Sequence, residues 1–407
     1  MTTNSNDVIV SLDVGSSKVL CVVARPGDDK GFHRVLGIGN VRSQGIRQGT
    51  VIDVEEAVHS IRKAVSEAQY TSGVKIDRVW GSIGGQTQVS YNCTGAAVPR
   101  SREVRQEDVT LAEVNARQNA IQQGQGRDLV KLIPQGYRVG DVIAPRSPVG
   151  LTGSKLEALV HAVYGSASNA ENLKRCMQRS GLELVDYEPH AWAAAQATLT
   201  ETEKTCGAVV IDIGAETTSM AVFREGVIAF SNVRPWGAEY FTRDIAMVLG
   251  IELDEAEALK VSAGTCDPDR VLPGEIVQAG KRPRPYLREL VAKTLQARVK
   301  EFFELYRRTL IEAKVFDSIE LVVLTGGGAS LRGIDVAAGR MLGKRVRIGC
   351  PQFIEGDTPV LLQPDATVAM GLIRCAEMGD LSDTASYGKK PLPNFFGRLR
   401  NVFVGDY

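Results

Sequence analysis

Several common functional signatures are missing from this sequence of 407 residues. Lys and Arg together number 48, as do Asp and Glu, so no overall field attracts nucleic acid and any charge-driven binding is local. The Walker pattern GxxxxGK[ST] and the dinucleotide pattern GxGxxG are both absent, which argues against a P-loop and a Rossmann site. The seven cysteines never take CxxC spacing and the four histidines are far apart, so we expect no metal site built from His and Cys.

Targeting and membrane-spanning signals are missing too. The opening residues, MTTNSNDVIVSLD, lack the basic and apolar regions of a signal peptide, and no apolar run reaches the length of a membrane span. Scattered, odd-numbered cysteines favour reduced thiols in a cytoplasm. Hydrophobic residues make up 43% and charged residues 24%, which is typical of a soluble globular protein, and the length predicts two or more domains.

One pattern occurs twice, about half a chain length apart. VIVSLDVGSSK (residues 8–18) is a buried-strand pattern followed by Asp, Gly and hydroxyl residues, and AVVIDIGAETTS (residues 208–219) repeats it with Asp212 in the place of Asp13. So long a repeat indicates a duplicated domain rather than a solenoid. Each copy can grip phosphate, because the carboxylate suits hydrated Mg²⁺ while glycine and the turn N–H groups approach an anion. A single copy is more often an ordinary Asp-Gly turn between two strands, but two copies at domain spacing favour phosphate binding.

Three further stretches complete the pattern. IELVVLTGGGASLRGI (residues 319–334) is an apolar strand, a glycine triplet and a helix start, where backbone can lie flat against a ligand. YEPHAWAAAQATL (residues 187–199) and PDATVAMGLIRCA (residues 364–376) predict helices whose small residues allow a close crossing at a hinge.

In this order, the five stretches resemble the nucleotide-binding set of the superfamily of actin, sugar kinases and heat-shock chaperone ATPases. Within it the chain is similar, over essentially its whole length, to the FtsA family of actin-like bacterial cell-division proteins, which anchor FtsZ filaments to the membrane. The most telling segments are residues 237–250, residues 254–264, the glycine triplet and the amphipathic end. A small-molecule kinase would need an aspartate base beside an acceptor pocket, and neither can be placed from the sequence. A chaperone would need a large peptide-binding domain after the ATPase, but only about thirty residues follow the stretch at 364–376. An actin-like pilus-assembly protein, which shares the core motifs, and a small-molecule kinase of the superfamily remain as alternatives.

The resemblance implies an α/β actin-like ATPase fold, with two duplicated lobes around a nucleotide cleft and an FtsA-type extra subdomain. The expected segments of the first lobe are residues 1–83, 164–203 and 351–377. Those of the second lobe are residues 204–233 and 307–350 for its core and 234–306 for its outer subdomain. The extra subdomain at 84–163 has no nucleotide motif, which favours interaction with other division proteins. Its patterns predict strands at 87–95, 132–140 and 156–165 and a helix at 106–121.

ATP with Mg²⁺ in the cleft is the implied ligand. Asp13 and Asp212 would hold the Mg²⁺ through water, and Lys18 would be a point charge on the phosphates. Glu257 and Lys260 match positions that reach the ribose or adenine, although an ordinary surface ion pair explains them equally well. The other expected nucleotide contacts are Gly15, Ser16, Ser17, Gly214, Thr217, Gly237, Gly326, Gly327 and Gly328.

Two glutamates bear on hydrolysis. Glu188 resembles a water-orienting catalytic carboxylate of the chaperones, or else it is a partner of a helix dipole. Glu216, with Ala215, stands where many relatives carry Gly-Gly, and a carboxylate beside a triphosphate repels it unless it turns away or faces Mg²⁺. We therefore expect ATP binding with at most weak ATPase activity.

A basic segment at 281–310 is the expected partner surface. It carries nine basic residues against three acidic ones and predicts an amphipathic helix. The resemblance implies that the FtsZ C-terminal tail binds here, with Arg298 and Glu301 at the matching positions, whereas the other interpretation is a solvated helix face. Head-to-tail filaments are implied by the resemblance alone.

The chain ends in a polar linker at 378–392 and an amphipathic segment at 393–407. At 100° per residue the apolar side chains of the segment share one arc flanked by arginines, and it is too short to span a bilayer. It predicts a helix lying on anionic lipid, with docking onto the protein's own core as the alternative. The resemblance implies that this membrane surface is the cytoplasmic face of the inner membrane at the division septum. The residues expected to touch lipid are Phe395, Phe396, Arg398, Leu399, Arg400, Val402 and Phe403.

Overall fold

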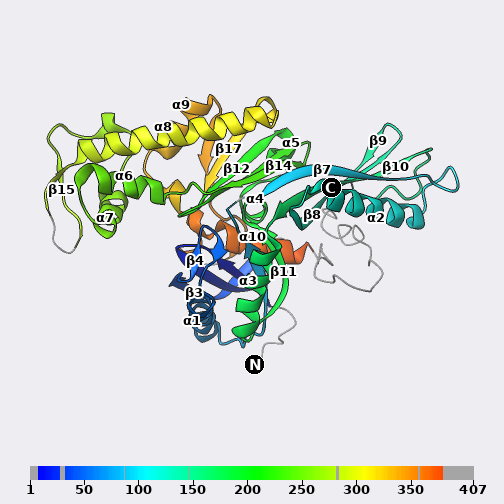
Figure 1. The fold of residues 1–407 in the computed structure, drawn as a ribbon, viewed down its shortest axis with the longest axis horizontal. Helices are drawn as coiled ribbons and strands as arrows, with labels where there is room; N and C mark the ends of the chain where they lie inside the picture. The colour runs from blue at the N-terminus through cyan, green and yellow to red at the C-terminus, as the bar shows by residue number, and fades with distance from the viewer. Residues whose placement is uncertain are drawn as a thin grey trace.

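The chain forms two lobes and an extra subdomain (Figure 1). A computed structural model describes residues 8–27, 33–86, 88–145, 147–280, 284–355 and 358–378. The second lobe and the extra subdomain form an elongated upper layer, and the first lobe lies beneath its centre (Figure 1). This arrangement is the expected α/β actin-like architecture.

A six-stranded sheet is the centre of the first lobe, in the order β11-β6-β1-β2-β3-β19. Its strands are β1 (Ile9–Val14), β2 (Lys18–Pro26), β3 (His33–Arg42), β6 (Arg78–Ile83), β11 (Glu183–Pro189) and β19 (Ile354–Glu355). Helices α1 (Val54–Ser72) and α3 (Ala167–Arg179) pack on it, and β4 (Ile46–Arg47) and β5 (Thr50–Val51) form a small ribbon. Helix α1 begins where the Asp53 side chain accepts hydrogen bonds from two backbone N–H groups, and it ends at Gly73 in the left-handed conformation.

A nine-stranded sheet runs through the second lobe and on into the extra subdomain, in the order β18-β17-β12-β13-β14-β7-β10-β8-β9. The second-lobe strands are β12 (Ala208–Ile213), β13 (Thr218–Arg224), β14 (Val227–Arg234), β17 (Leu321–Thr325) and β18 (Arg345–Ile348). Its helices are α5 (Glu201–Cys206), α6 (Glu239–Leu249), α7 (Leu253–Ala263), α8 (Arg288–Glu312) and α9 (Ile334–Leu342). The shorter elements are η2 (Pro268–Arg270), β15 (Ile276–Val277), β16 (Tyr286–Leu287), η3 (Phe316–Ser318) and η4 (Gly327–Ser330). The predicted amphipathic helix in the basic segment is confirmed by α8, whose apolar side chains are buried in the second-lobe core.

The extra subdomain is a small sheet covered by one helix. It contains β7 (Val89–Ala97), α2 (Gln106–Gln123), β8 (Asp128–Val139), β9 (Val142–Ala144) and β10 (Leu156–Gly165), which confirms the predicted helix and strands. Helix α2 lies close to β7, because a Cβ on Gly95 would be 1.9 Å from the backbone nitrogen of Ala116. Strand β7 pairs with β14 at Val89 and Asn232, so a subdomain inserted in the first lobe contacts the sheet of the second.

Two helices cross between the lobes, as the small-residue stretches predicted. They are α4 (His190–Thr198) and α10 (Thr367–Glu377), the latter preceded by η5 (Pro364–Ala366), and both lie at the centre of the molecule (Figure 1). A Cβ on Gly371 would be 1.8 Å from the backbone oxygen of Ala193, so this crossing requires a glycine.

The C-terminal predictions fall outside the described residues, which end at 378. They concern the linker and the amphipathic segment with Phe395, Phe396, Arg398, Leu399, Arg400, Val402 and Phe403. Within the described ranges, no helix combines the length and apolar character needed to cross a bilayer.

Candidate functional site

The two Asp-Gly hairpins are alike in register and in turn. In the first, Asp13 lies opposite Leu20, and the Gly15 N–H donates to the Lys18 carbonyl at 3.0 Å. In the second, Asp212 lies opposite Ser219. Its turn closes in the same way, because the Gly214 N–H donates to the Thr217 carbonyl at 2.9 Å. The repeat predicted from sequence is therefore a repeat of backbone structure.

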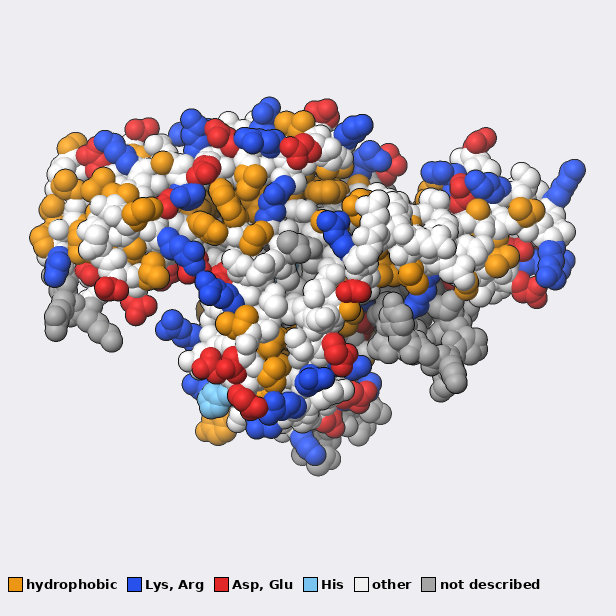
Figure 2. Space-filling view, viewed as in Figure 1, with side chains coloured by type: hydrophobic (Ala, Val, Ile, Leu, Met, Phe, Trp, Pro, Cys, Tyr) orange, Lys and Arg blue, Asp and Glu red, His pale blue; other side chains and the backbone are white. Residues whose placement is uncertain are grey.

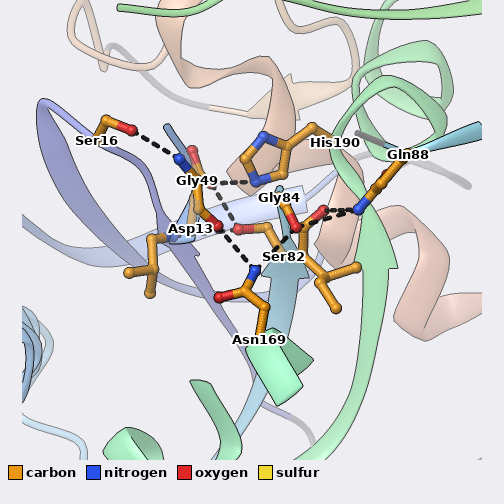
Figure 3. Close-up of polar contacts among 10 residues, drawn as sticks. Asp13, Ser16, Gly49, Ser82, Gly84, Gln88, Asn169 and His190 are labelled. Atoms are coloured by element: carbon orange, nitrogen blue, oxygen red, sulfur yellow. Dashed lines mark hydrogen bonds and ion pairs between the residues drawn. The ribbon is translucent and has the colours of Figure 1, made fainter. Parts of the chain in front are cut away.

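The two hairpin carboxylates lie close enough to repel each other. The Ser82 hydroxyl donates to Asp13 Oδ1 at 2.7 Å, and His190 Nε2 lies 3.7 Å from the same oxygen (Figure 3). The pKa of Asp212 is raised to about 6, mainly by burial and in part by the Asp13 carboxylate, while His190 and Lys18 oppose the shift. Two buried carboxylates this close to each other make a favourable environment for a hydrated divalent cation. The donor set therefore fits Mg²⁺ held through water.

The glycine triplet reaches the second hairpin. Gly326 has a φ of 79°, and a Cβ there would lie 2.4 Å from Asp212 Oδ1, so the position demands glycine. Its N–H donates to the Pro364 carbonyl at 2.9 Å. Gly328 packs on Ile213, where a Cβ would lie 2.3 Å from the side chain, and Gly327 is less crowded. The triplet, the second hairpin and the start of the second hinge helix therefore meet at one place.

Lys18 already has an anionic partner. Its Nζ lies 2.6 Å from Asp365 Oδ2, which joins the first hairpin to η5. Sequence reasoning missed Asp365 and His190, although each is part of a hinge-helix stretch quoted for its small residues. It also missed Ser82, which nothing in its local pattern distinguishes.

Glu257 and Lys260 lie beside the second hairpin. Lys260 Nζ is 2.7 Å from Glu257 and donates to Thr242 Oγ1 at 2.8 Å and to the Ala238 carbonyl at 3.3 Å. The Thr242 hydroxyl also donates to Glu257. Gly237 packs on the hairpin turn, because a Cβ there would lie 2.3 Å from the Ala215 carbonyl. The structure thus brings these three predicted residues to one end of the hairpin.

The hairpin turns differ in exposure and partners. Ser16 Oγ accepts a hydrogen bond from the Gly49 N–H at 3.0 Å, which leaves the hydroxyl proton to point elsewhere (Figure 3). Ser17 is exposed, and its carbonyl accepts from the Ser43 N–H at 2.9 Å. Thr217 is half-buried. Glu216 accepts from the backbone N–H of Gln48 at 2.5 Å, so its carboxylate contacts the first lobe.

Glu188 is completely enclosed. Its Oε1 lies 3.0 Å from Lys131 Nζ, which is also 2.8 Å from Asp186 Oδ2. Lys131 is on β8 of the extra subdomain, so this ion triad joins that subdomain to the first lobe. Burial raises the pKa of Glu188 to about 7, with Lys131 opposing that shift. Among the described residues, the other oxygen of this carboxylate, Oε2, has no hydrogen-bond partner.

Arg298 is held within the outer subdomain. Its Nε and one terminal nitrogen donate to both oxygens of Asp244 at 2.5 and 2.8 Å, and the other donates to Glu301 at 2.6 Å. The guanidinium also lies over the rings of Trp236 and Tyr240. Hydrogen bonds to Asp244 are the first reason that the pKa of Arg298 is raised. Sequence reasoning did not identify Asp244, which is on α6, because nothing local links the two helices.

Two family descriptions match this chain: "Cell division protein FtsA" over residues 209–371 and "SHS2 domain inserted in FTSA" over residues 85–164. The cell division protein FtsA of Pseudomonas aeruginosa is 33% identical over 374 residues, covering 91% of this chain and 89% of the relative. Among solved structures, a PilM-PilN type IV pilus biogenesis complex has a TM-score of 0.66 at 16% identity, covering 90% of this chain and 98% of that one. MreB5 of Spiroplasma citri bound to AMPPNP has a TM-score of 0.55 at 15% identity, covering 91% and 96%.

Proposed function

We propose that this chain, which belongs to the FtsA family of cell-division proteins, binds ATP between its lobes and tethers FtsZ filaments to the membrane. The observation that carries the nucleotide part is the meeting of Asp13, Asp212 and the glycine triplet at one place between the lobes. In the proposed site, Mg²⁺ is held through water by the two aspartates, and it neutralises phosphate charge when bound. An MreB5 structure with AMPPNP supports an adenine nucleotide as the ligand of this fold.

The protein's own groups supply most of the binding. Ser16, Ser17 and Thr217 offer hydroxyls on the two turns, and Gly15 and Gly214 let the backbone approach the phosphates. Lys18 would exchange Asp365 for phosphate, or contact both. Gly326, Gly327 and Gly328 lie under the nucleoside, while Gly237, Glu257 and Lys260 are on its ribose or adenine side. Because the Glu188 side chain is buried and paired with Lys131 through one oxygen, we propose that hydrolysis is slow.

Removal of one aspartate tests the nucleotide site. In Asp212→Ala, we expect affinity for a fluorescent ATP analogue with Mg²⁺ to fall about 10- to 100-fold. This is the usual loss when a residue that hydrogen-bonds to a ligand of the metal is removed. The matched control is Asp317→Ala, which removes an exposed aspartate from the same lobe. Fluorescence titration measures both. Equal affinities for the wild type and Asp212→Ala would remove the site assignment.

The outer subdomain is the proposed FtsZ-binding surface. Exposed apolar side chains gather there (Figure 2), among them Met247 and Val261, which are 75% and 69% exposed. Glu301 is 56% exposed beside Arg298. The apolar residues of an FtsZ tail would pack on these exposed apolar side chains. Its acidic residues would compete with Asp244 and Glu301 for the guanidinium of Arg298.

Residues 393–407 are the proposed lipid anchor, which would place the chain on the cytoplasmic face of the inner membrane at the septum. Each buried apolar side chain contributes roughly 1.5 to 3 kcal/mol, and less at an interface. Ordering the helix costs about 1 to 2 kcal/mol per residue, so one tail binds weakly. Head-to-tail filaments would gain avidity, and the extra subdomain would remain available to other division proteins.

A further inference from the structure

A tight turn of the first lobe lies between the two hairpins. Strands β4 and β5 pair at Arg47 and Thr50, which leaves Gln48 and Gly49 as a two-residue loop. Their φ angles are 48° and 69°, and two positive values are the geometry of a type I′ turn. Glycine takes such angles readily, but a glutamine rarely does. We call residues 45–51 the latch turn.

Side chains from three separate elements hold the backbone of the latch turn. Ser16 Oγ of the first hairpin accepts from the Gly49 N–H at 3.0 Å. Asn169 Nδ2 of α3 donates to the Gly49 carbonyl at 3.0 Å and to the Gly84 carbonyl at 3.2 Å (Figure 3). Glu216 of the second hairpin accepts from the Gln48 N–H at 2.5 Å. Of these contacts, the one from Glu216 comes from the other lobe.

We propose that Glu216 is a latch residue that holds the two lobes together across the cleft by binding the Gln48 N–H. An ionised acceptor makes the stronger kind of hydrogen bond, so this contact resists separation of the lobes. The unusual backbone angle of Gln48 aims the N–H at the carboxylate, and a non-glycine residue held at such an angle at a contact between lobes indicates a functional constraint.

The same contact explains how a carboxylate is tolerated beside a phosphate site. Arg243 is another charged group near Glu216, but its guanidinium is held by Glu239 at 2.9 Å. The Glu216 carboxylate is therefore directed at the latch turn. Opening of the cleft requires this hydrogen bond to break, so the latch governs how fast a ligand enters and leaves. The effect on ligand entry and exit rests on the proposed nucleotide site, whereas the contact between Glu216 and Gln48 does not.

Amide hydrogen exchange tests the latch without nucleotide. In Glu216→Ala, the Gln48 amide of the full-length protein should exchange about tenfold to a hundredfold faster, the range for losing a hydrogen bond to a charged group. Mass spectrometry with fragmentation to single amides measures it. Glu320→Ala, which removes an exposed carboxylate of the same lobe, should leave the rate unchanged. Unchanged exchange of Gln48 in Glu216→Ala would overturn the latch, and unchanged amides in α8 establish that the variant is folded.

Dissociation of a fluorescent ATP analogue separates the latch from simple repulsion. Glu216→Asp keeps the charge but is one methylene shorter, so it cannot reach Gln48. If Glu216 is a latch, both Glu216→Ala and Glu216→Asp release the analogue faster than the wild type does. If Glu216 instead repels phosphate, Glu216→Ala releases it more slowly and Glu216→Asp behaves like the wild type, which contradicts the proposal. If neither the wild type nor the variants bind the analogue while Gln48 exchange is faster in Glu216→Ala, the nucleotide site is refuted and the latch is supported.

Discussion

Several carboxylates in this protein are buried in polar pairs. Glu113 on α2 is 5% exposed, and the Tyr137 hydroxyl donates to it at 2.6 Å. Burial raises the pKa of Glu113 to about 7, and the hydrogen bond from Tyr137 lowers it by less. The extra subdomain thus contains a carboxyl group that binds its proton more tightly when folded than when unfolded.

The pKa of Glu113 predicts a pH dependence of stability. The pKa of Glu113 is about 7 in the folded protein and 4.5 ordinarily. The stabilisation that proton binding by Glu113 gives the folded state is therefore fully present below pH 4.5 and is lost as pH rises through 7. Glu113→Gln mimics the neutral acid. As pH rises from 5 to 8, the free energy of unfolding of this variant should therefore increase by up to about 2 kcal/mol relative to that of the wild type. Thermal unfolding of both proteins across this range measures the difference. Parallel pH profiles would show that Glu113 does not titrate abnormally.

At the scale of elements, the hinge depends on the close approach of α4 and α10. Their small residues were visible in the sequence, and so was the repeat of the two hairpins. The latch turn was not predictable, because Gln-Gly is a weaker hairpin signal than Asn-Gly and its partners Ser16, Asn169 and Glu216 are distant in sequence. The partners of Glu188 and Arg298 were hidden for the same reason: Lys131 and Asp244 reach them only through tertiary packing.

Two glycine substitutions in helices should have opposite effects. Gly371→Ala places a Cβ 1.8 Å from the Ala193 carbonyl, so the hinge helices must separate, and we expect a loss of about 3 kcal/mol. In Gly339→Ala on α9, the new Cβ has no neighbouring atom closer than 3.7 Å. The better helix propensity of alanine should therefore stabilise the folded protein by up to about 1 kcal/mol. Differential scanning calorimetry measures both. A melting temperature unchanged by Gly371→Ala would show that α4 and α10 leave room for an additional methyl group.

At the scale of the whole molecule, the extra subdomain bridges both lobes. Its strand β7 pairs with β14 of the second lobe, and Lys131 binds Asp186 and Glu188 of the first. The sequence predicted the subdomain's elements but not this bridge, because its contacts join residues that are distant in sequence; Asn92 Nδ2, for example, donates to the Ala229 carbonyl at 2.8 Å. Movement of the lobes therefore changes the position of the proposed interaction subdomain.

The central claim is that the chain links FtsZ filaments to lipid. The direct measurement is flotation of purified FtsZ with anionic liposomes in the presence of ATP and either the wild type or Phe396→Glu combined with Phe403→Glu. Charges on the apolar arc oppose burial at the lipid surface, so the account predicts that FtsZ floats with the wild type and stays in the dense fraction with the double variant. Equal ATP binding by the two proteins is the control. Equal flotation of FtsZ with both proteins would contradict the account.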